Sequence, residues 1–376
     1  MRILHLVGQR EDAGGILSVI RCLHQSGPAA GIQHSVWVHR DYAETRSPQL
    51  DYRRTGFIAS DSPSHLAIFL TSVLAFFSLR KLLRNESFDV IHAHTRGGLI
   101  VALIAGLFLG RHVLFTNHSY ANRTWLYRWA ARRKWMTTVV LNPNMAAHYD
   151  LAIEPPKCSI IFSGCADRFF EEPLKTNAWP SADPLAKLKL VGMGTLVRWK
   201  GWHHPVAALA KLPAELKARV EFHLWGPEQS DADSQAFAAE LRELIETHNL
   251  HETVFLHGST RKVVESLQSG HFVVVASENE PCSVSLMEAL ALGLPALAAR
   301  SGGNVDIVQD GTTGLLYDTG SIDDLRDKIA VILNGEFTPA TASEIRYSVR
   351  GWAASEMTAK YNQLYAQLAK HNGDAT

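Results

Sequence analysis

The chain has 376 residues, 46% hydrophobic and 20% charged, which is enough to bury the cores of two ordinary domains. Its 37 basic and 37 acidic residues balance, which argues against a dedicated nucleic-acid-binding protein. The balance is uneven, because residues 1–150 hold 17 Lys and Arg against 9 Asp and Glu, whereas the remainder holds 20 against 28. A basic amino-terminal half suits an anionic acceptor or an anionic lipid surface.

The spacing of the cysteines, the sequence after Met1 and the lengths of the apolar runs predict a cytoplasmic protein. No two of the cysteines have the spacing of a zinc or redox site, which favours a reduced compartment. Met1-Arg2 leads directly into a strand pattern, so we expect no signal peptide. The longest apolar runs, 66–79 and 99–109, are shorter than the roughly 20 residues that a spanning helix needs. The cysteines are Cys22, Cys158, Cys165 and Cys282.

The first half of the chain alternates between strand and helix patterns. A strand at 3–7 is followed by a glycine-containing loop that includes Gly15 and by a helix over about 16–25. Gly15 permits close approach of the backbone to a ligand. The region 65–84 predicts a helix that is apolar almost all round, and is therefore buried or at a membrane surface. Further strands are expected at 35–38, 90–92, 113–116 and 138–141.

The second half repeats this alternation after a proline-rich linker at about 154–184. Strands alternating with helices predict parallel sheets. We therefore predict an α/β protein with two doubly wound, Rossmann-like domains that face a cleft, 1–170 and 185–340. A long helix within 342–376 is expected to pack back on the first domain. Strands are expected at 188–193, 220–225, 254–257, 272–276 and 296–298, with helices near 205–211, 233–249 and 261–268.

The segment Ser277–Gly303, SENEPCSVSLMEALALGLPALAARSGG, is the most informative part of the chain. An apolar strand ends in a polar loop with Glu280, and a helix follows that carries Glu288. In such units ligands bind beyond the carboxyl ends of the strands, and the free amides at a helix start suit a phosphate. Carboxylates accept hydrogen bonds from sugar hydroxyls. The segment indicates a site for a molecule with both a phosphate and a sugar, although spacing alone leaves a purely structural role for the glutamates open.

Glu280, seven residues, Glu288 and then ALALGLP resemble the signature of the retaining glycosyltransferases of family four, which have the two-domain GT-B fold. Gly302-Gly303 and DGTTGLL at 310–316 follow at the family's spacing. The resemblance implies that Glu288 holds ribose hydroxyls and that Glu280 holds hydroxyls of the transferred sugar. It also implies that the amides of three residues bind the donor diphosphate: Ser283, Val284 and Ser285.

Other positions fit the same resemblance. Lys200-Gly201 matches the family's donor-diphosphate loop, and Arg198 stands in for an arginine where this chain has Thr195. Cations there would offset the charge that develops on a departing diphosphate. His118 matches a histidine near the reacting centre, and Gly15 a glycine that closes on the donor. We add Gly258, directly after the predicted strand 254–257, to the donor-binding set.

Three further patterns have competing interpretations. His92 and His94 lie on one face of an extended segment, as a metal pair would, but no third ligand is apparent and a structural role is favoured. The sequence Asp231-Ala232-Asp233 resembles a metal-binding carboxylate pair, yet an ordinary helix cap explains it better. Asp306 occupies a place where the family usually has Glu. We expect no metal and no cofactor.

The segment 122–136 contains five Lys and Arg with three Trp and one Tyr. Basic and aromatic residues on one helix suit a membrane interface, whereas Trp125 and Trp129 packed inward would indicate ordinary surface. The acid-free span 90–149 favours reversible attachment to an anionic membrane, on its cytoplasmic face.

The function predicted from all of this is transfer of a sugar from a UDP- or GDP-sugar to a glycan or lipid-linked acceptor with retention of configuration, in polysaccharide or glycoconjugate synthesis. Two alternatives stay open. One is a nucleotide-sugar epimerase or hydrolase on the same fold. The other is a sugar-nucleotide-binding protein without activity. A product assay with and without acceptor separates the three.

Overall fold

The computed structural model describes residues 1–10, 15–44, 50–55, 65–174, 179 and 187–373. It divides into two compact units, Met1–Gly164 with Ala354–Thr376, and Cys165–Ala353. Each unit contains one all-parallel sheet with helices, so the predicted class of two doubly wound α/β domains is confirmed. Gly14 and most of the predicted linker after Leu174 lie outside the described residues.

The first unit is built on a seven-stranded parallel sheet of order β3-β2-β1-β4-β5-β6-β7. The strands predicted from apolar runs are present, because fully buried parallel strands are apolar on both faces. The two edge strands were missed, β3 because its sequence DYRRT has no apolar run, and β7 because it lies in the segment predicted to be a linker. The strands are β1 (Arg2–Leu6), β2 (Gln33–His39), β3 (Asp51–Thr55), β4 (Val90–Ala93), β5 (Val113–Asn117), β6 (Met136–Val140) and β7 (Cys158–Ile160).

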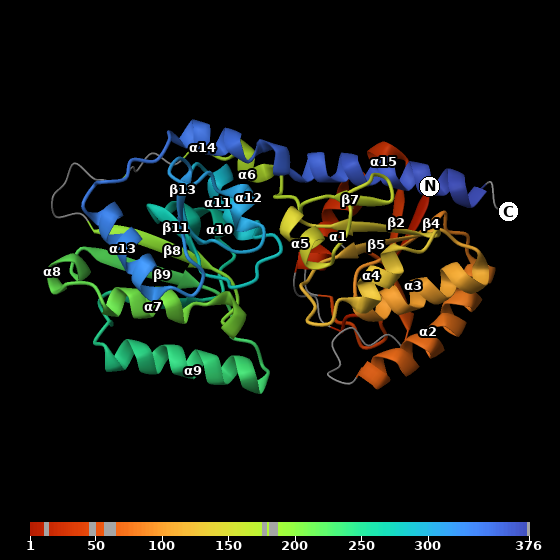
Figure 1. The fold of residues 1–376 in the computed structure, drawn as a ribbon, viewed down its shortest axis with the longest axis horizontal. Helices are drawn as coiled ribbons and strands as arrows, with labels where there is room; N and C mark the ends of the chain where they lie inside the picture. The colour runs from red at the N-terminus through yellow and green to blue at the C-terminus, as the bar shows by residue number, and fades with distance from the viewer. Residues whose placement is uncertain (11–14, 45–49, 56–64, 175–178, 180–186, 374–376) are drawn as a thin grey trace. The chain divides into compact units, whose positions relative to one another are not determined.

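Two helices from opposite ends of the chain share one face of this sheet. Helix α1 (Gly15–Ser26) and helix α15 (Ala354–Gly373) lie side by side, as Figure 1 shows. Their side chains join one apolar cluster with residues of β1, β4, β5 and β6. The carboxyl-terminal helix therefore packs on the amino-terminal domain, as predicted. The members from α15 are Met357, Tyr361, Leu364, Tyr365 and Leu368.

The remaining helices of the first unit include a pair with an exposed apolar side. Helix α3 (Arg96–Leu109) packs on β4 and β5, and α2 (His65–Asn85) packs on α3. The helix predicted over 122–136 is shorter, α4 (Trp125–Ala131). Helices α5 (Pro143–His148) and α6 (Arg168–Glu171) follow, the latter in the second unit. Among the described residues, Leu66–Asn85 is long and apolar enough to cross a membrane by length and composition, contrary to the estimate from the apolar run alone, and 28% of its apolar window is buried.

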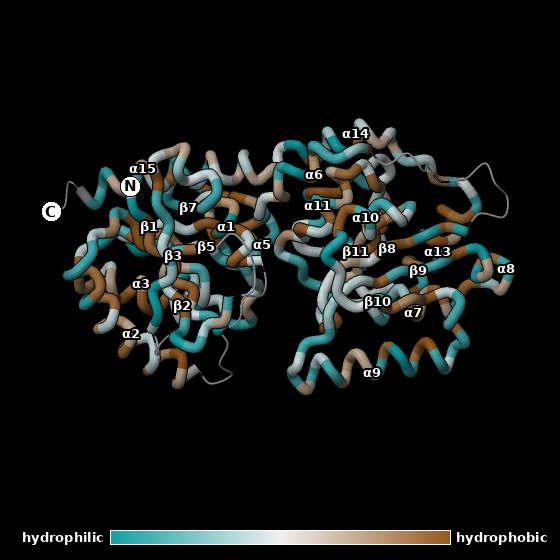
Figure 2. The backbone as a smooth tube through the Cα atoms, turned by 180° about the vertical axis from the view of Figure 1, so that it is seen from behind, coloured by the Kyte–Doolittle hydropathy of each residue, from teal (hydrophilic) through white to brown (hydrophobic). Residues whose placement is uncertain are grey.

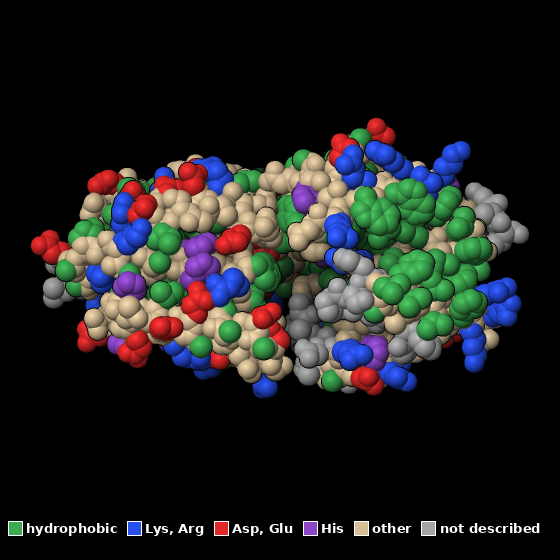
Figure 3. Space-filling view, turned by 60° about the horizontal axis from the view of Figure 1, so that its bottom comes forward, with side chains coloured by type: hydrophobic (Ala, Val, Ile, Leu, Met, Phe, Trp, Pro, Cys, Tyr) green, Lys and Arg blue, Asp and Glu red, His purple; other side chains and the backbone are tan. Residues whose placement is uncertain are grey.

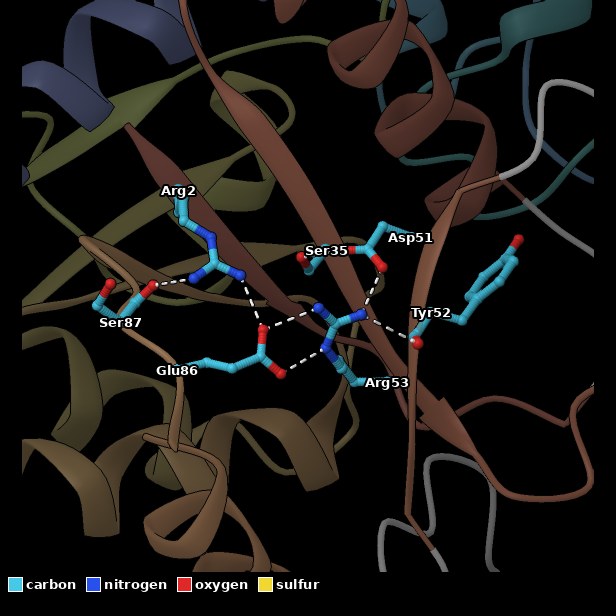
Figure 4. A network of polar contacts seen from close by, with 7 residues as sticks. All are labelled: Arg2, Ser35, Asp51, Tyr52, Arg53, Glu86 and Ser87. Carbon is cyan, nitrogen blue, oxygen red and sulfur yellow. Dashed lines mark hydrogen bonds and ion pairs between the residues drawn. The ribbon is translucent and has the colours of Figure 1, made fainter. Parts of the chain in front are cut away.

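A polar network ties the edge strand β3 to the sheet (Figure 4). Glu86, just after α2, accepts from Arg2 at 2.8 Å and from Arg53 Nε at 2.9 Å. Arg53 also contacts Asp51, which accepts from the Ser35 hydroxyl at 2.6 Å. The two guanidinium groups hold the pKa of Glu86 at about 2. These charges supplement the apolar contact that Tyr52 of β3 makes with Tyr42.

The second unit has a six-stranded parallel sheet of order β10-β9-β8-β11-β12-β13. Figure 2 shows that its outer helix α9 alternates between hydrophilic and hydrophobic residues, which fits one buried and one exposed side. The strands are β8 (Leu188–Met193), β9 (Val220–Trp225), β10 (Val254–Gly258), β11 (Phe272–Val275), β12 (Ala296–Ala299) and β13 (Gly314–Tyr317). The helices are α7 (His203–Ala210), α8 (Ala214–Lys217), α9 (Ala232–Thr247), α10 (Val263–Gln268), α11 (Val284–Ala291), α12 (Asn304–Ile307), α13 (Ile322–Leu333) and α14 (Ala342–Ser348).

The long final helix predicted over about 342–370 is wrong as a single element. It is broken between α14 and α15 by the short 3-10 turn Arg350–Trp352, followed by Ala353 in an extended conformation. Gly351 lies in this break. Helix α14 belongs to the second unit and contacts α11, whereas α15 belongs to the first. Within this stretch the chain passes from the second unit to the first, after Ala353.

Strand order reverses direction once in each sheet, between β1 and β4 and between β8 and β11. At such a point the connections leave to opposite sides, and the loops at the carboxyl ends of the two strands form a crevice that binds ligands. The loops after β8 and β11 contain Lys200 and Glu280. The topology therefore explains why two residues 80 positions apart in the sequence come together.

Candidate functional site

Lys200 and Glu280 form a largely buried ion pair at this point of the second sheet. Lys200 Nζ lies 2.6 Å from Glu280 Oε2, with side-chain exposures of 16% and 7%. The hydroxyl of Ser277 donates to the same carboxylate oxygen at 3.0 Å. A buried charge is tolerated only when it is paired and hydrogen-bonded, and here each side chain supplies the opposite charge that the other needs. The pair brings together one predicted diphosphate ligand and one predicted sugar ligand.

Glycines hold the loop of Glu280 close to its neighbours. A Cβ on Gly302 would lie 1.9 Å from the carbonyl oxygen of Glu280, and Gly302 has a φ of +51°. The next residue, Gly303, donates its amide to that carbonyl at 2.9 Å. The Ser301 hydroxyl donates to the carbonyl of Ser277 at 2.8 Å. The glycine pair thus fixes the backbone that presents Glu280.

The loop of Lys200 is joined to the same segment. Gly201 has a φ of +67°, and a Cβ there would meet the carbonyl oxygen of Ala276 at 2.2 Å. The amide of Glu278 donates to the carbonyl of Trp199 at 3.1 Å. Lys200 Nζ also lies 4.3 Å from the centre of the Trp199 ring. The two loops therefore behave as one backbone scaffold around the ion pair.

The start of α11 supplies backbone donors next to this pair. Ser283 is its N-cap and accepts from the amide of Leu286 at 3.4 Å, while Val284 and Ser285 form the first turn. The amides of the first turn have no partner within the helix and carry the positive end of the helix dipole. The predicted phosphate contacts of Ser283, Val284 and Ser285 are geometrically available at this helix start.

Glu288 lies in the second turn of α11 in an environment that disfavours its charge. Burial raises the pKa of its carboxyl to about 7, only partly offset by the Arg168 guanidinium. No hydrogen bond or ion pair joins this carboxylate to another residue that the structure describes. A strongly shifted carboxyl in a ligand crevice is typical of a functional group.

Arg198 points elsewhere. Its guanidinium forms an exposed ion pair with Glu240 on α9 and lies 5.1 Å from the centre of the Phe237 ring. Lys200 is thus the cation that the structure brings to Glu280, and Arg198 is not. The sequence placed both in the loop after β8, but the 3-10 turn Arg198–Lys200 sends their side chains to different partners.

The remaining predicted residues of this unit lie at a strand end, at a helix cap and within α12. Gly258 ends β10 with a φ of +69° and open space around its Cβ position. Asp231 caps α9 by accepting from the amide of Ser234 at 2.9 Å, which is the structural role favoured above. Asp306 has a buried Oδ2 without a described hydrogen-bond partner, and burial raises its pKa.

In the first unit His118 belongs to a chain of four imidazoles that the sequence did not reveal. His118 Nε2 lies 3.0 Å from His94 Nδ1, and His94 Nε2 lies 2.9 Å from His5 Nδ1. His5 Nε2 lies 2.9 Å from His34 Nδ1. The chain crosses β5, β4, β1 and β2 in the order of the sheet. The alternation of His92 and His94 in one segment was visible in the sequence, but no local signal marked His5 and His34 of the neighbouring strands as partners of His94.

Burial keeps these rings uncharged. It lowers the pKa of His118 and His34 to about 4, and it lowers the pKa of His5 and His94 well below the usual range. Proximity of the rings to one another adds to the effect for His5 and His94. At neutral pH each ring is therefore one donor and one acceptor.

His92 has its own partners beside this chain. Its Nδ1 lies 2.8 Å from the Tyr365 hydroxyl and its Nε2 lies 2.8 Å from Thr116 Oγ1, which in turn lies 3.0 Å from the Tyr361 hydroxyl. The fold supplies the third imidazole that the sequence lacked, because donor atoms of His5, His92 and His94 lie within 4.8 Å of one another. All six ring nitrogens already have a hydrogen-bond partner, which agrees with the structural role favoured above.

Gly15 is the first residue of α1, the helix that follows the switch-point strand β1 of the first sheet in the chain. It is exposed, and nothing lies within 4 Å of its Cβ position. The Gly15 backbone is therefore open to approach at the carboxyl edge of the sheet.

Two doubly wound, Rossmann-like domains are the architecture of the GT-B class of glycosyltransferases. Residues 176–350 match the family described as glycosyl transferases group 1, and residues 13–157 match Glycosyltransferase Family 4. The chain belongs to the GT-B glycosyltransferases of the family 4 type.

Known proteins agree with this assignment. The chain is 35% identical over 101 residues to the sulfoquinovosyl transferase SQD2 of Arabidopsis thaliana, covering 26% of this chain and only 18% of that one. It is 26% identical over 345 residues to D-inositol 3-phosphate glycosyltransferase of Corynebacterium glutamicum, covering 83% and 80%. The structure of Anabaena HepE in complex with UDP superposes with a TM-score of 0.74 at 16% identity, covering 98% of this chain and 100% of that one.

Proposed function

We propose that the chain transfers a sugar from a nucleotide diphospho-sugar, with a UDP- or GDP-sugar as donor, to a glycan or lipid-linked acceptor with retention of configuration. The observation that carries the proposal is the Lys200–Glu280 pair beside the start of α11, at the switch point of the second sheet. The UDP found with the structurally similar HepE supports a nucleotide donor. We further propose that transfer needs no metal, and that it serves polysaccharide or glycoconjugate synthesis.

The ion pair suits such a donor because the donor offers a chemically matching group to each of its two side chains. A diphosphate offers anionic oxygens to Lys200, and sugar hydroxyls donate to Glu280. The amides at the start of α11 add donors for phosphate. In the transfer, the bond from the anomeric carbon to the diphosphate oxygen breaks, the bond to the acceptor oxygen forms, and the proton of the acceptor hydroxyl passes to the departing diphosphate. Lys200 then stabilises the charge left on the diphosphate. The predicted roles of His118 and Gly15 at the transferred sugar are part of the same proposal.

A donor screen tests the function directly. The chain is incubated with UDP-, GDP- and ADP-sugars, with and without glycan and lipid-linked acceptors, and with and without chelator. We expect one donor to be consumed only when an acceptor is present, equally with chelator. Consumption without acceptor would indicate the epimerase or hydrolase, and intact donor under every condition would indicate a binding protein.

Nucleotide affinity should depend on pH through Glu288. Ribose hydroxyls donate to a carboxylate, so the donor nucleotide binds the ionised form of Glu288, whose pKa burial raises to about 7. Affinity should be full above pH 7 and fall about tenfold for each pH unit below it. Glu288→Gln should weaken binding roughly tenfold to a hundredfold at pH 8, because a charge-assisted hydrogen bond is lost.

Calorimetry with UDP and GDP at pH 6 and pH 8 measures both effects. The nucleotide's own phosphate titration is common to both proteins, so the difference between wild type and Glu288→Gln reports Glu288. Glu278→Gln, an exposed glutamate in the neighbouring loop, is the matched control and should keep the wild-type profile. Parallel pH profiles for wild type and Glu288→Gln would remove Glu288 from ribose binding.

A further inference from the structure

The first unit exposes a broad apolar surface on α2, α3 and α4. Figure 3 shows hydrophobic side chains gathered on one face of the molecule, with Lys and Arg beside them. Each contributing side chain is 45% exposed or more. Monomeric soluble proteins rarely expose so many large apolar side chains together. We use the name apolar face for the surface formed by these residues: Leu66, Phe69, Leu70, Leu74, Phe77, Leu107, Phe108, Trp125 and Trp129.

A cavity of about 880 Å³ opens within this face. Ile68 and Phe69 of α2, Ile100 and Ile104 of α3, and Trp129 of α4 are among its lining residues. Trp135 also lines it. Its ring packs closely on α3 at Gly106, where an added Cβ would lie 1.9 Å from the ring. The cavity is therefore an apolar slot between helices, of a size that suits a hydrocarbon chain.

The polar members of the cavity wall are cationic or neutral. Arg96, Arg123 and Arg133 line it with Asn122, and no Asp or Glu does. Arg96 begins α3 directly after β4, and its Nε donates to the Tyr127 hydroxyl at 3.3 Å. His118 follows β5, the neighbouring parallel strand. The part of the cavity wall formed by Arg96 thus lies at the same edge of the sheet as the predicted catalytic histidine.

Charge on the surrounding surface is mostly positive, and the acid at its border, Asp150, pairs with Arg128 of α4. Between residues 62 and 149 the acids are Glu86 and Asp89, and both bind Arg2. Opposed copies of this surface would bring cations against cations, which disfavours self-association through it. An anionic bilayer complements both its charge and its apolar centre. The exposed cations of these elements are Arg80, Lys81, Arg84, Arg123, Arg132 and Lys134.

We propose that the apolar face docks the first unit on an anionic lipid bilayer, and that the cavity takes the hydrocarbon chain of a phosphate-headed lipid whose head lies at Arg96 and Arg123. The acceptor part of this inference rests on the proposed function. It names as the acceptor class an anionic lipid, one hydrocarbon chain of which enters the cavity. The docking part stands without it. Helix α2 lies on the bilayer and does not cross it, because it is packed on α3 and leads into the central strand β4.

Vesicle flotation of the full chain tests docking. We expect binding to phosphatidylcholine vesicles with about one third phosphatidylglycerol at low salt, at least tenfold weaker binding in high salt, and little binding to phosphatidylcholine alone. Leu74→Asp with Phe77→Asp should reduce binding at least tenfold, because both side chains are exposed and acids repel the anionic surface. Tyr347→Asp, 77% exposed in the second unit, is the matched control and should bind as wild type does.

Calorimetry with dodecyl phosphate, and with inorganic phosphate as reference, tests the cavity. Dodecyl phosphate should bind and inorganic phosphate should not. Ile100→Trp, which fills the slot, should abolish dodecyl phosphate binding while flotation is retained, and circular dichroism checks that the variant folds. Wild type that never floats with anionic vesicles at low salt, or an acid variant that floats equally, overturns docking. Equal dodecyl phosphate binding by Ile100→Trp overturns the cavity, and neither result depends on sugar transfer.

Discussion

Lys200→Met is expected to reduce turnover by on the order of a hundredfold to a thousandfold, the usual effect of removing one group that stabilises developing charge. Lys200 Nζ is the cation that the fold brings to Glu280, at 2.6 Å. Its charge is needed most when the bond to the diphosphate breaks, so turnover should fall more than nucleotide affinity. Steady-state kinetics with the donor found by the screen give both quantities.

Arg198→Met is the matched control for this variant. It removes a cation two residues away whose guanidinium pairs with Glu240 at an exposed site, and such pairs contribute little to stability or function. We expect a change in turnover of less than about tenfold. Equal losses for the two variants would mean that Arg198 swings to the donor, and an active Lys200→Met would remove Lys200 from the mechanism.

Gly302→Ala is expected to damage both stability and activity. Its Cβ would lie 1.9 Å from the backbone oxygen of Glu280, so the loop that presents Glu280 must shift. The comparison is Gly320→Ala, because Gly320 also has a positive φ, +78°, but has nothing within 4 Å of the Cβ position. Conformation alone costs about 1–2 kcal/mol for alanine in this region.

The difference between the two variants isolates the close approach to Glu280. We expect the free energy of unfolding to fall by at least about 2 kcal/mol more for Gly302→Ala than for Gly320→Ala, with loss of activity only in the former. Denaturant titration and the transfer assay measure the two effects. If both variants lose the same stability and keep activity, the glycine pair does not position Glu280.

The sequence predicted the sheets well because their strands are buried on both faces. Apolar runs such as 188–193 and 272–276 predict buried strands directly. The charged edge strand Asp51–Thr55 depends instead on the contact of Arg53 with Glu86, which only the fold brings together. The order of residues also predicted which loops hold Lys200 and Glu280. The sequence could not predict that Arg198 pairs with Glu240, because that contact depends on where α9 packs relative to the loop after β8.

The His118 environment was also beyond the sequence. His5 and His34 occupy strand positions where apolar residues are usual, and nothing local marks them as partners of His94. Tyr361 and Tyr365 reach the neighbouring His92 group from the other end of the chain, through a helix that was predicted to dock but not in which register. Side-chain networks of this kind depend on the relative register of four strands and one helix, which periodicity does not encode.

The four-histidine chain has a direction, and its buried end sets it. His34 Nε2 is buried without a hydrogen-bond partner among the described residues. A bare lone pair is tolerated there better than an orphaned N–H, so the hydrogen of His34 sits on Nδ1. His5 must then donate from Nδ1 to His94, and His94 from Nδ1 to His118, because each neutral ring has one hydrogen to give. His118 therefore keeps its own hydrogen on Nδ1 and presents a donor there. The tautomer of His118 is thus set by the environment of His34, three rings away along the chain of imidazoles.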